Sequence, residues 1–298
     1  MATDKDLLNA LSGAQPLGKA KGPIPIRRRL NPMEEFQKVK DLYPDLSNDK
    51  ANFLIIGAHG TGKTYSLLTA PGPVVIDSFD PGGTRCIPAK YIESGQIMVR
   101  NYEFDTAVKP QAFRTWEADF NRWKNGGMFD SIGTYAIDFT RWAQSLMHAI
   151  LEGRGRKPLA GKADLGKDPD IVPELGDYNL HQKTLAQYLA DITNLPCHVV
   201  VMAHLNIDKD EKVGRMFSSV YVDGKKFAQN VPSLFDEVYF AEVIGQNNFV
   251  WQLVPRSYYP ARSRLRSDGV LKITEGQDFR SILKRAGYYH EDRQLQTT

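Results

Sequence analysis

Eight residues near position 60 have the types and spacing of a phosphate-binding loop. They are Gly57, Ala58, His59, Gly60, Thr61, Gly62, Lys63 and Thr64, which match G-x-x-x-x-G-K-[ST]. Glycines let the backbone close around a phosphate with its N–H groups pointing inward, and the start of a helix adds partial positive charge. Lys63 would reach the β- and γ-phosphates, and the Thr64 hydroxyl would ligate Mg²⁺. With Tyr65 after them, these residues predict a site for ATP and Mg²⁺. The motif assigns no chemistry to His59.

An acidic residue at the end of a second apolar run completes the predicted magnesium site. Asp138 directly follows the run Thr134–Ile137. An acid in this place beside a phosphate-binding loop holds Mg²⁺ through water. The same carboxylate could cap the helix predicted over Thr140–Leu151, and both roles can hold at once.

Hydrolysis also needs a group that orients or deprotonates water. Many ATPases of this class place a glutamate directly after the magnesium-binding aspartate, but Phe139 stands there in this chain. The base must therefore come from elsewhere. Asp80, which ends the segment after the run Val74–Ile76, is the first candidate, and Asp77 is the second. An aspartate before Pro-Gly is also a common turn residue, so a purely structural role stays open.

Two further groups could act on a phosphate. His204 ends the apolar run His198–Ala203 and could sense the γ-phosphate, or it could simply cap the strand. Arg262 and Arg264 belong to a basic, acid-free segment between Arg256 and Arg266. An arginine supplied by a neighbouring subunit can stabilise transition-state charge. The alternative is a solvated or DNA-facing basic strand.

The elements that must position these residues alternate between apolar runs and helical patterns. The runs are Asn52–Ile56, Val74–Ile76, Thr134–Ile137 and His198–Ala203; the helical patterns are Thr64–Thr69, Gln111–Lys124, Thr140–Leu151, Asn179–Thr193 and Phe279–Ala286. Continuous apolar strands that alternate with helices predict an α/β fold with a mostly parallel central sheet flanked by helices. Shorter strands over Glu237–Phe240 and Phe249–Val254 are expected to be antiparallel at one sheet edge.

Composition limits the class of protein. The chain has 298 residues, with 42% hydrophobic and 24% charged residues, which excludes a collagen-like or wholly disordered chain. Its two cysteines imply no disulfide framework and fit a reducing cytoplasm. The longest apolar run is too short for a bilayer helix, so we expect no membrane contact. We predict a flexible basic arm with a short helix (Met33–Leu42) over residues 1–50, a nucleotide-binding core over 51–266, and a tail with a helix over 267–298.

Two long polar stretches interrupt the core, each after an element that carries a candidate site residue. The first is Glu152–Asp177 and the second is Asn206–Lys226. Their cations are Lys157, Lys162, Lys167, Lys209, Lys212, Arg215, Lys225 and Lys226, and Phe217 and Tyr221 are the rings of the second stretch. Acids are interspersed, so neither stretch is a purely basic patch; if they bind a single strand of nucleic acid, backbone neutralisation and base stacking are the expected mode.

The ordered set of motifs resembles the RecA-like core of phage nucleotide-binding proteins, in particular phage single-strand annealing ATPases of the RecA superfamily. The resemblance covers roughly residues 51–283 and rests on GAHGTGKT, VVIDSFDPGG, YAID, LPCHVVVMAHL, VPSLFDEVYF and ARSRL. It implies that Lys63, Thr64 and Asp138 bind Mg-ATP and that His204 is the sensor. It also implies that Asp80 or Asp77 activates water and that Arg262 or Arg264 reaches a neighbour's nucleotide. The Asp77-x-x-Asp80 spacing departs from the Asp-x-Glu of RecA.

By this resemblance the chain is expected to bind single-stranded DNA with ATP, to assemble head to tail as a ring or filament, and to promote annealing or recombination. A single-strand binding protein is a further candidate partner, and the expected location is the cytoplasm, that of the host if a phage encodes the chain. The alternative is a nucleotide-gated assembly factor with little turnover. A small-molecule kinase is disfavoured because the sequence shows no acceptor pocket, and GTP because the Asn-Lys-x-Asp pattern is missing.

Overall fold

A computed structural model describes residues 31, 33–34, 50–80, 82–102, 110–155, 172–209, 214, 216–256, 259–266 and 269–288. The chain divides into two units, Met1–Leu46 and Ser47–Thr298. Most of the predicted basic arm lies outside the described residues; Met33 and Glu34, which begin the predicted short helix, are helical. Among the described residues, no helix combines the length and the apolar character that crossing a bilayer requires.

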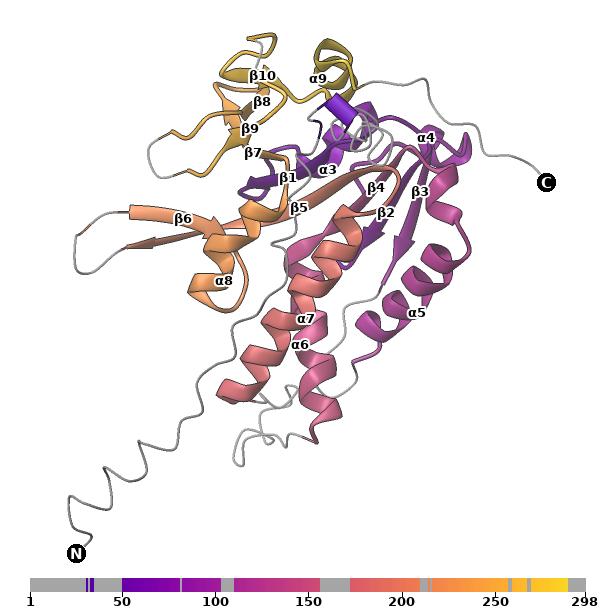
Figure 1. Ribbon diagram of the computed structural model, residues 1–298, viewed down its shortest axis with the longest axis vertical. Coiled ribbons are helices and arrows are strands. Elements are labelled where there is room, and N and C mark those ends of the chain that lie inside the picture. Colours follow the sequence, from indigo (N-terminus) through magenta and orange to yellow (C-terminus); the bar gives the residue numbers. More distant parts are fainter. Residues whose placement is uncertain are drawn as a thin grey trace, which may run out of the picture. The chain divides into compact units, whose positions relative to one another are not determined.

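The second unit is built on one twisted sheet in which neighbouring strands lie in the order β10-β8-β7-β1-β5-β4-β2-β3 (Figure 1). The parallel strands are β7 (Glu237–Ile244), β1 (Asn52–Gly57), β5 (His198–Lys209), β4 (Thr134–Asp138), β2 (Val74–Ser78) and β3 (Ile97–Asn101). The antiparallel edge holds β8 (Asn248–Gln252) and β10 (Thr274–Gly276), and β9 (Arg262–Ser263) pairs with β7. The predicted α/β fold is confirmed. The predicted antiparallel pairing of the two late strands at one edge is also confirmed, because β7 pairs antiparallel with β8 while it pairs in parallel with β1.

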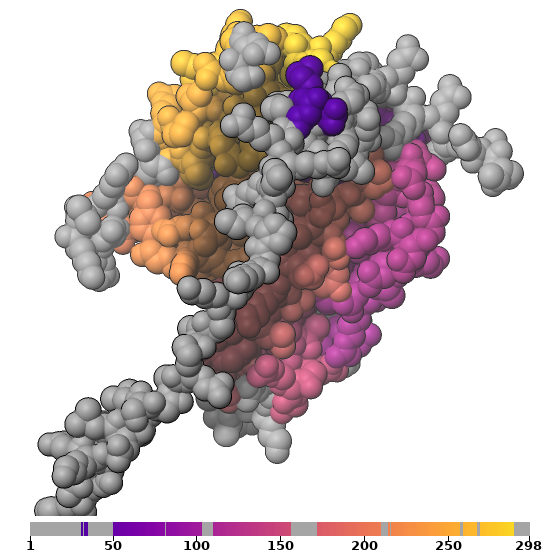
Figure 2. Space-filling model, viewed as in Figure 1, coloured from indigo at the N-terminus to yellow at the C-terminus, as the bar shows by residue number. Residues whose placement is uncertain are grey.

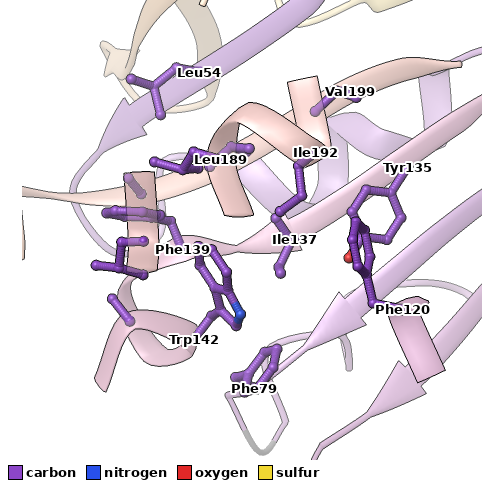
Figure 3. Packing of buried hydrophobic residues seen from close by; sticks show 14 of the residues in the cluster. Leu54, Phe79, Phe120, Tyr135, Ile137, Phe139, Trp142, Leu189, Ile192 and Val199 are labelled. Atoms are coloured by element: carbon purple, nitrogen blue, oxygen red, sulfur yellow. The ribbon is translucent and has the colours of Figure 1, made fainter. Parts of the chain in front are cut away.

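Helices cover both faces of this sheet because successive strand side chains point to opposite faces. On one face, Leu54 and Ile56 belong to the cluster formed with α5 (Ala112–Asn125), α6 (Phe139–Gly153) and α7 (Leu175–Thr193). Figure 3 shows Phe139 and Trp142 of α6 beside Leu189 and Ile192 of α7 in that cluster. On the other face, Phe53 and Ile55 pack with α9 (Phe279–Ala286) and the segment after the phosphate-binding loop. The short helices α4 (Ala89–Glu93) and α8 (Lys225–Asn230) also belong to this unit.

The segment after residue 266, predicted to be a separate tail, is part of the same unit. The Phe279 ring lies 5.0 Å from Phe53 and 4.5 Å from Trp251, measured between ring centroids. The Asp278 side chain caps α9 by accepting from the Ser281 N–H at 2.9 Å. In Figure 2 the yellow C-terminal atoms are continuous with the orange atoms of β7 and β8. The structure therefore shows no division of the core at residue 266.

The second polar stretch is a β-hairpin where a polar loop was predicted. β5 continues from the buried His198 to the exposed Lys209, and β6 (Met216–Val220) returns antiparallel to it. Leu205 pairs with Val220 and Lys209 with Met216. Figure 1 shows the two strands projecting beyond the sheet as a ribbon.

Asp77, the second candidate for the base, is completely buried in the core at the end of β2. Its carboxylate accepts two hydrogen bonds from Arg100 at 2.6 and 2.7 Å, one from Tyr135 Oη at 2.6 Å and one from Trp116 Nε1 at 2.9 Å. These donors occupy the oxygens that a catalytic base would turn toward water. The structure therefore gives Asp77 a structural role and removes it as a base candidate.

We expect Asp77→Ala to lower the free energy of unfolding by about 3–5 kcal/mol, because the Arg100 guanidinium is left buried without its counter-ion. Urea denaturation measures this loss. The double variant Asp77→Ala/Arg100→Met should recover part of it, since both charges are then removed. A loss in the double variant equal to the sum of the losses in Asp77→Ala and Arg100→Met would contradict this structural role. An unchanged urea midpoint for Asp77→Ala would contradict it as well.

Candidate nucleotide-binding site

A cavity of about 360 Å³ opens at the carboxyl ends of β1 and β4 and beside Met202–His204 of β5. Ligands of open α/β sheets bind at this end of the strands. The strand order sets its geometry: β5 lies between β1 and β4, so Gly57 pairs with His204, and Met202 of β5 pairs with Asp138 of β4. The residues that line it are His59, Gly60, Thr61, Gly62, Lys63, Thr64, Tyr65, Asp80, Gly83, Cys86, Asp138, Met202, Ala203, His204 and Phe249.

Glycine is required at particular points of the loop. A Cβ at Gly57 would lie 2.7 Å from the Ala241 carbonyl oxygen and 2.8 Å from Thr61 Oγ1, so no larger residue fits. Gly60 and Gly62 have φ angles of 73° and 82°, in the left-handed region that favours glycine. The helix that follows is shorter than predicted, with α3 covering only Lys63–Ser66 before a 3₁₀ turn over Leu67–Thr69. The backbone N–H groups of the loop, more than a helix dipole, would therefore hold a phosphate.

The Lys63 ammonium lies across the loop. Lys63 Nζ donates to the Gly57 carbonyl at 3.0 Å and to the Ala58 carbonyl at 2.7 Å. Burial lowers the pKa of Lys63 from 10.5 to about 8, and the charge of Asp138 opposes this shift. An ammonium held by neutral carbonyls in a partly desolvated place interacts strongly with a phosphate that replaces them.

Asp138 is positioned for both roles that the sequence left open, capping the following helix and holding Mg²⁺. Its Oδ1 accepts from the N–H groups of Thr140 at 3.1 Å and Arg141 at 3.4 Å, which caps α6. Its carboxylate also lines the cavity, where burial raises its pKa and the charge of Lys63 lowers it. The donor set of Thr64 hydroxyl and one carboxylate fits Mg²⁺, which keeps several waters and takes its other ligands from phosphates. Among the described residues, no group of three or more metal-ligating side chains offers a separate metal cage.

Asp80 lies where a base would be needed. It lines the cavity together with Lys63 and Asp138, and its charge raises the pKa of Asp138. Its backbone carbonyl accepts from the Gly83 N–H at 2.8 Å, and Gly82 has a φ of 84°. This turn directs the segment after β2 back to the cavity, which Asp77 does not line.

His204 and His59 form a pair that the sequence did not predict. Their ring centroids are 4.0 Å apart, and both rings line the cavity. The His204 backbone N–H donates to Thr140 Oγ1 at 3.1 Å. In the imidazole ring, Nδ1 has no hydrogen-bond partner among the described residues. Burial, together with the charges of Lys63 and His59, lowers the pKa of His204 from 6.5 to about 4. His204 is therefore neutral at pH 7.

Both candidate arginines lie at the opposite end of the sheet from the loop. Arg262 and Ser263 pair with the start of β7, and Arg262 donates to the carbonyls of Pro232 and Phe235. Arg264 forms an ion pair with Asp236 at 2.7 Å. Neither guanidinium lines this chain's own cavity. If Arg262 or Arg264 acts on a nucleotide, that nucleotide would have to be bound by another subunit.

The proposed DNA-binding cations are divided by what the structure describes. Lys209, Lys225 and Lys226 are exposed on the β5–β6 hairpin and at the start of α8. Lys225 Nζ lies 4.6 Å from the centroid of the Phe217 ring. The others lie outside the described residues: Lys157, Lys162, Lys167, Lys212 and Arg215.

The structure brings in residues that the motifs do not mark. Phe249, from the β7–β8 hairpin, lines the cavity beside Tyr65, and both rings are exposed. Gln277 Nε2 donates to the Thr61 carbonyl at 2.8 Å and to the Val250 carbonyl at 3.2 Å, which fixes the loop to the sheet edge. Only the fold brings residues so far apart in sequence to the loop.

We expect the pH dependence of folding to carry the signature of His204. Because its folded pKa is near 4 and its ordinary value is 6.5, the unfolded chain binds more protons between these values. The stability that depends on a neutral His204 is therefore complete above pH 6.5 and is lost as the pH falls toward 4. Side-chain NMR titration measures the pKa, and His204→Gln should flatten this part of the stability profile. A His204 midpoint near 6.5 would refute the shift.

Comparison with known proteins places this site in a family. No curated protein matches the sequence. Among solved structures, the flagellar accessory protein FlaH from Methanocaldococcus jannaschii matches with 9% identity and a TM-score of 0.32, over 72% of this chain and 81% of that chain. At this identity and TM-score, no property of FlaH is assigned to this chain. Residues 49–265, which include the loop, Asp80, Asp138 and His204, match the AAA_24 family, described as an AAA domain. The chain belongs to this family of AAA domains.

Proposed function

We propose that this protein is an ATPase that binds single-stranded DNA, assembles head to tail with copies of itself, and promotes annealing or recombination. One observation carries the proposal: a single strand, β5, connects the nucleotide cavity to a cationic hairpin. At His204 it pairs with Gly57 of the loop, and five residues later it presents Lys209 on the exposed ribbon. A change beside His204 in the cavity would thus reach the proposed DNA-binding surface through continuous backbone.

The cavity residues divide the chemistry of hydrolysis among them. Lys63 and the loop N–H groups would bind the phosphates, and Thr64 and Asp138 would hold Mg²⁺, which neutralises charge on the phosphate oxygens. Asp80 would orient the attacking water and accept its proton. Neutral His204 can accept or donate a hydrogen bond without adding charge to the site.

The hairpin and α8 supply what a single strand needs. Lys209, Lys225 and Lys226 would neutralise backbone phosphates, with an affinity that falls as salt rises. Tyr221, with 58% of its surface exposed, is the ring available for stacking, whereas Phe217 is partly buried and lies next to Lys225.

The second candidate is a nucleotide-gated assembly factor with little turnover. It is favoured by Phe139, which stands fully buried directly after Asp138, and by the intrachain partners of Arg262 and Arg264. The two candidates differ in one measurement. Steady-state ATP hydrolysis, with and without single-stranded DNA, is followed together with light scattering. DNA-stimulated turnover with assembly supports the first candidate, and nucleotide-dependent assembly without stimulation supports the second.

Lys63→Ala should abolish ATP binding, measured by calorimetry, without unfolding the protein, because its ammonium contacts loop carbonyls and not the core. Its urea midpoint should stay close to that of the wild type. Tight ATP binding by the variant would contradict the site.

Asp80→Asn should reduce turnover by about 10²–10⁴-fold, the usual contribution of a general base, while ATP affinity is retained. Phosphate release and nucleotide affinity are measured on the same preparation. Glu93→Gln, on the exposed face of α4, is a matched control that removes a carboxylate outside the cavity. Unchanged turnover in Asp80→Asn would show that another group activates the water.

A further inference from the structure

A second cavity of about 590 Å³ adjoins the nucleotide cavity. It lies between α6, α7 and the base of the β5–β6 hairpin, and it shares His59, Asp80 and His204 with its neighbour. No pocket beside the phosphate-binding loop was predicted from the sequence, so only the structure reveals this cavity. Its volume lies in the range of sites that enclose a small organic ligand.

One wall of this cavity holds a buried, incompletely bonded histidine. His181 of α7 is only 1% exposed, and its Nε2 lies 2.7 Å from the Ala143 carbonyl oxygen. A carbonyl can only accept, so Nε2 carries the proton and Nδ1 presents a lone pair. Nδ1 has no hydrogen-bond partner among the described residues. Because such buried groups normally have partners, a ligand N–H that reaches Nδ1 would supply the missing hydrogen bond.

The turn after β6 supplies another part of the lining. The Tyr221 backbone N–H donates to the His204 carbonyl at 2.8 Å, so the residue that carries this exposed ring is held to the strand that borders the nucleotide cavity. Gly224 has a φ of 93°, and a Cβ there would collide with the Gln182 amide of α7. This close approach of the turn to α7 leaves Tyr221 and Asp223 lining the cavity.

The charges of the lining favour a neutral, flat, polar ligand over a phosphate. Carboxylates at Asp80 and Asp223 face the cavity, and its one described cation, Arg141, donates to Gln144 Oε1 at 3.0 Å. The lysines lie outside, on the hairpin and α8. Phosphates of a single strand would therefore stay on the outer cations, while a base could enter. Imidazole, carboxylate and amide groups around an exposed ring suit a nucleobase edge and face.

We propose that this cavity receives one nucleobase of the bound single strand, stacked on Tyr221 with its polar edge toward His181. The inference rests on the proposed function, since it needs a single strand on the hairpin. It adds a base-binding pocket whose wall is hydrogen-bonded to His204. A base bound in the pocket would thereby act on the nucleotide cavity through the hydrogen bond between the Tyr221 N–H and the His204 carbonyl.

The test compares a dT oligonucleotide with an abasic oligonucleotide of the same length, at one salt concentration with Mg-ATP analogue. The wild type should bind the dT strand about tenfold more tightly than the abasic strand, the size expected for one stacked base. Tyr221→Ala should bring the two affinities within about threefold of each other, and Tyr221→Phe should keep the full difference. A 5-iodouracil strand should photocrosslink to Tyr221.

The outcomes separate the two proposals. Equal affinity of the wild type for both strands, or an undiminished difference in Tyr221→Ala, overturns the base pocket while DNA binding stands. Crosslinks confined to Phe217 also overturn it. No affinity for either strand overturns the proposed function, and the pocket with it. Transfer of the γ-phosphate to a free nucleoside would make the cavity an acceptor site and would likewise overturn the inference.

Discussion

The alignment of β1 between β5 and β7 is the constraint on which the site depends. Gly57 is the last residue of β1 and pairs with His204 on one side and Ala241 on the other. The backbone of Ala241 approaches so closely that only glycine fits. A register shift of one residue would turn every side chain of a strand to the opposite face. This register therefore fixes at once where the loop begins, where His204 points, and which residues of β1 enter each core cluster.

Burial gives the cavity its electrostatic character. It lowers the pKa values of Lys63 and His204 and raises that of Asp138, so that each group is pushed toward its neutral form. Groups of both signs thus share a place where charge is poorly solvated. Interactions with a phosphate or a magnesium ion are stronger there than at an open surface. Asp77 differs from Asp80 because its carboxylate is already satisfied by four hydrogen bonds from within the core.

The sequence predicted what depends on local pattern and missed what depends on distant pairing. The loop, Asp138 and the helix Phe279–Ala286 follow from motif and periodicity, since neighbours in sequence determine them. The core role of Asp77 could not be foreseen, because its partner Arg100 lies 23 residues away on β3. The extension of β5 was missed because Asn206, Asp208 and Lys209 interrupt the apolar run. Pairing with β6, which begins seven residues after Lys209, makes this segment a strand.

The hydrogen bond from Gln277 to the Thr61 carbonyl spans 216 residues of chain. A ribosome makes this protein from the N-terminus, so the loop sequence emerges long before the residue that holds it to the sheet edge. β7 and β8, which flank the loop, are also made late. The completed nucleotide site therefore becomes available only after Gln277 has been made. A nascent or prematurely ended chain carries the phosphate-binding sequence without the structure that makes it a competent site.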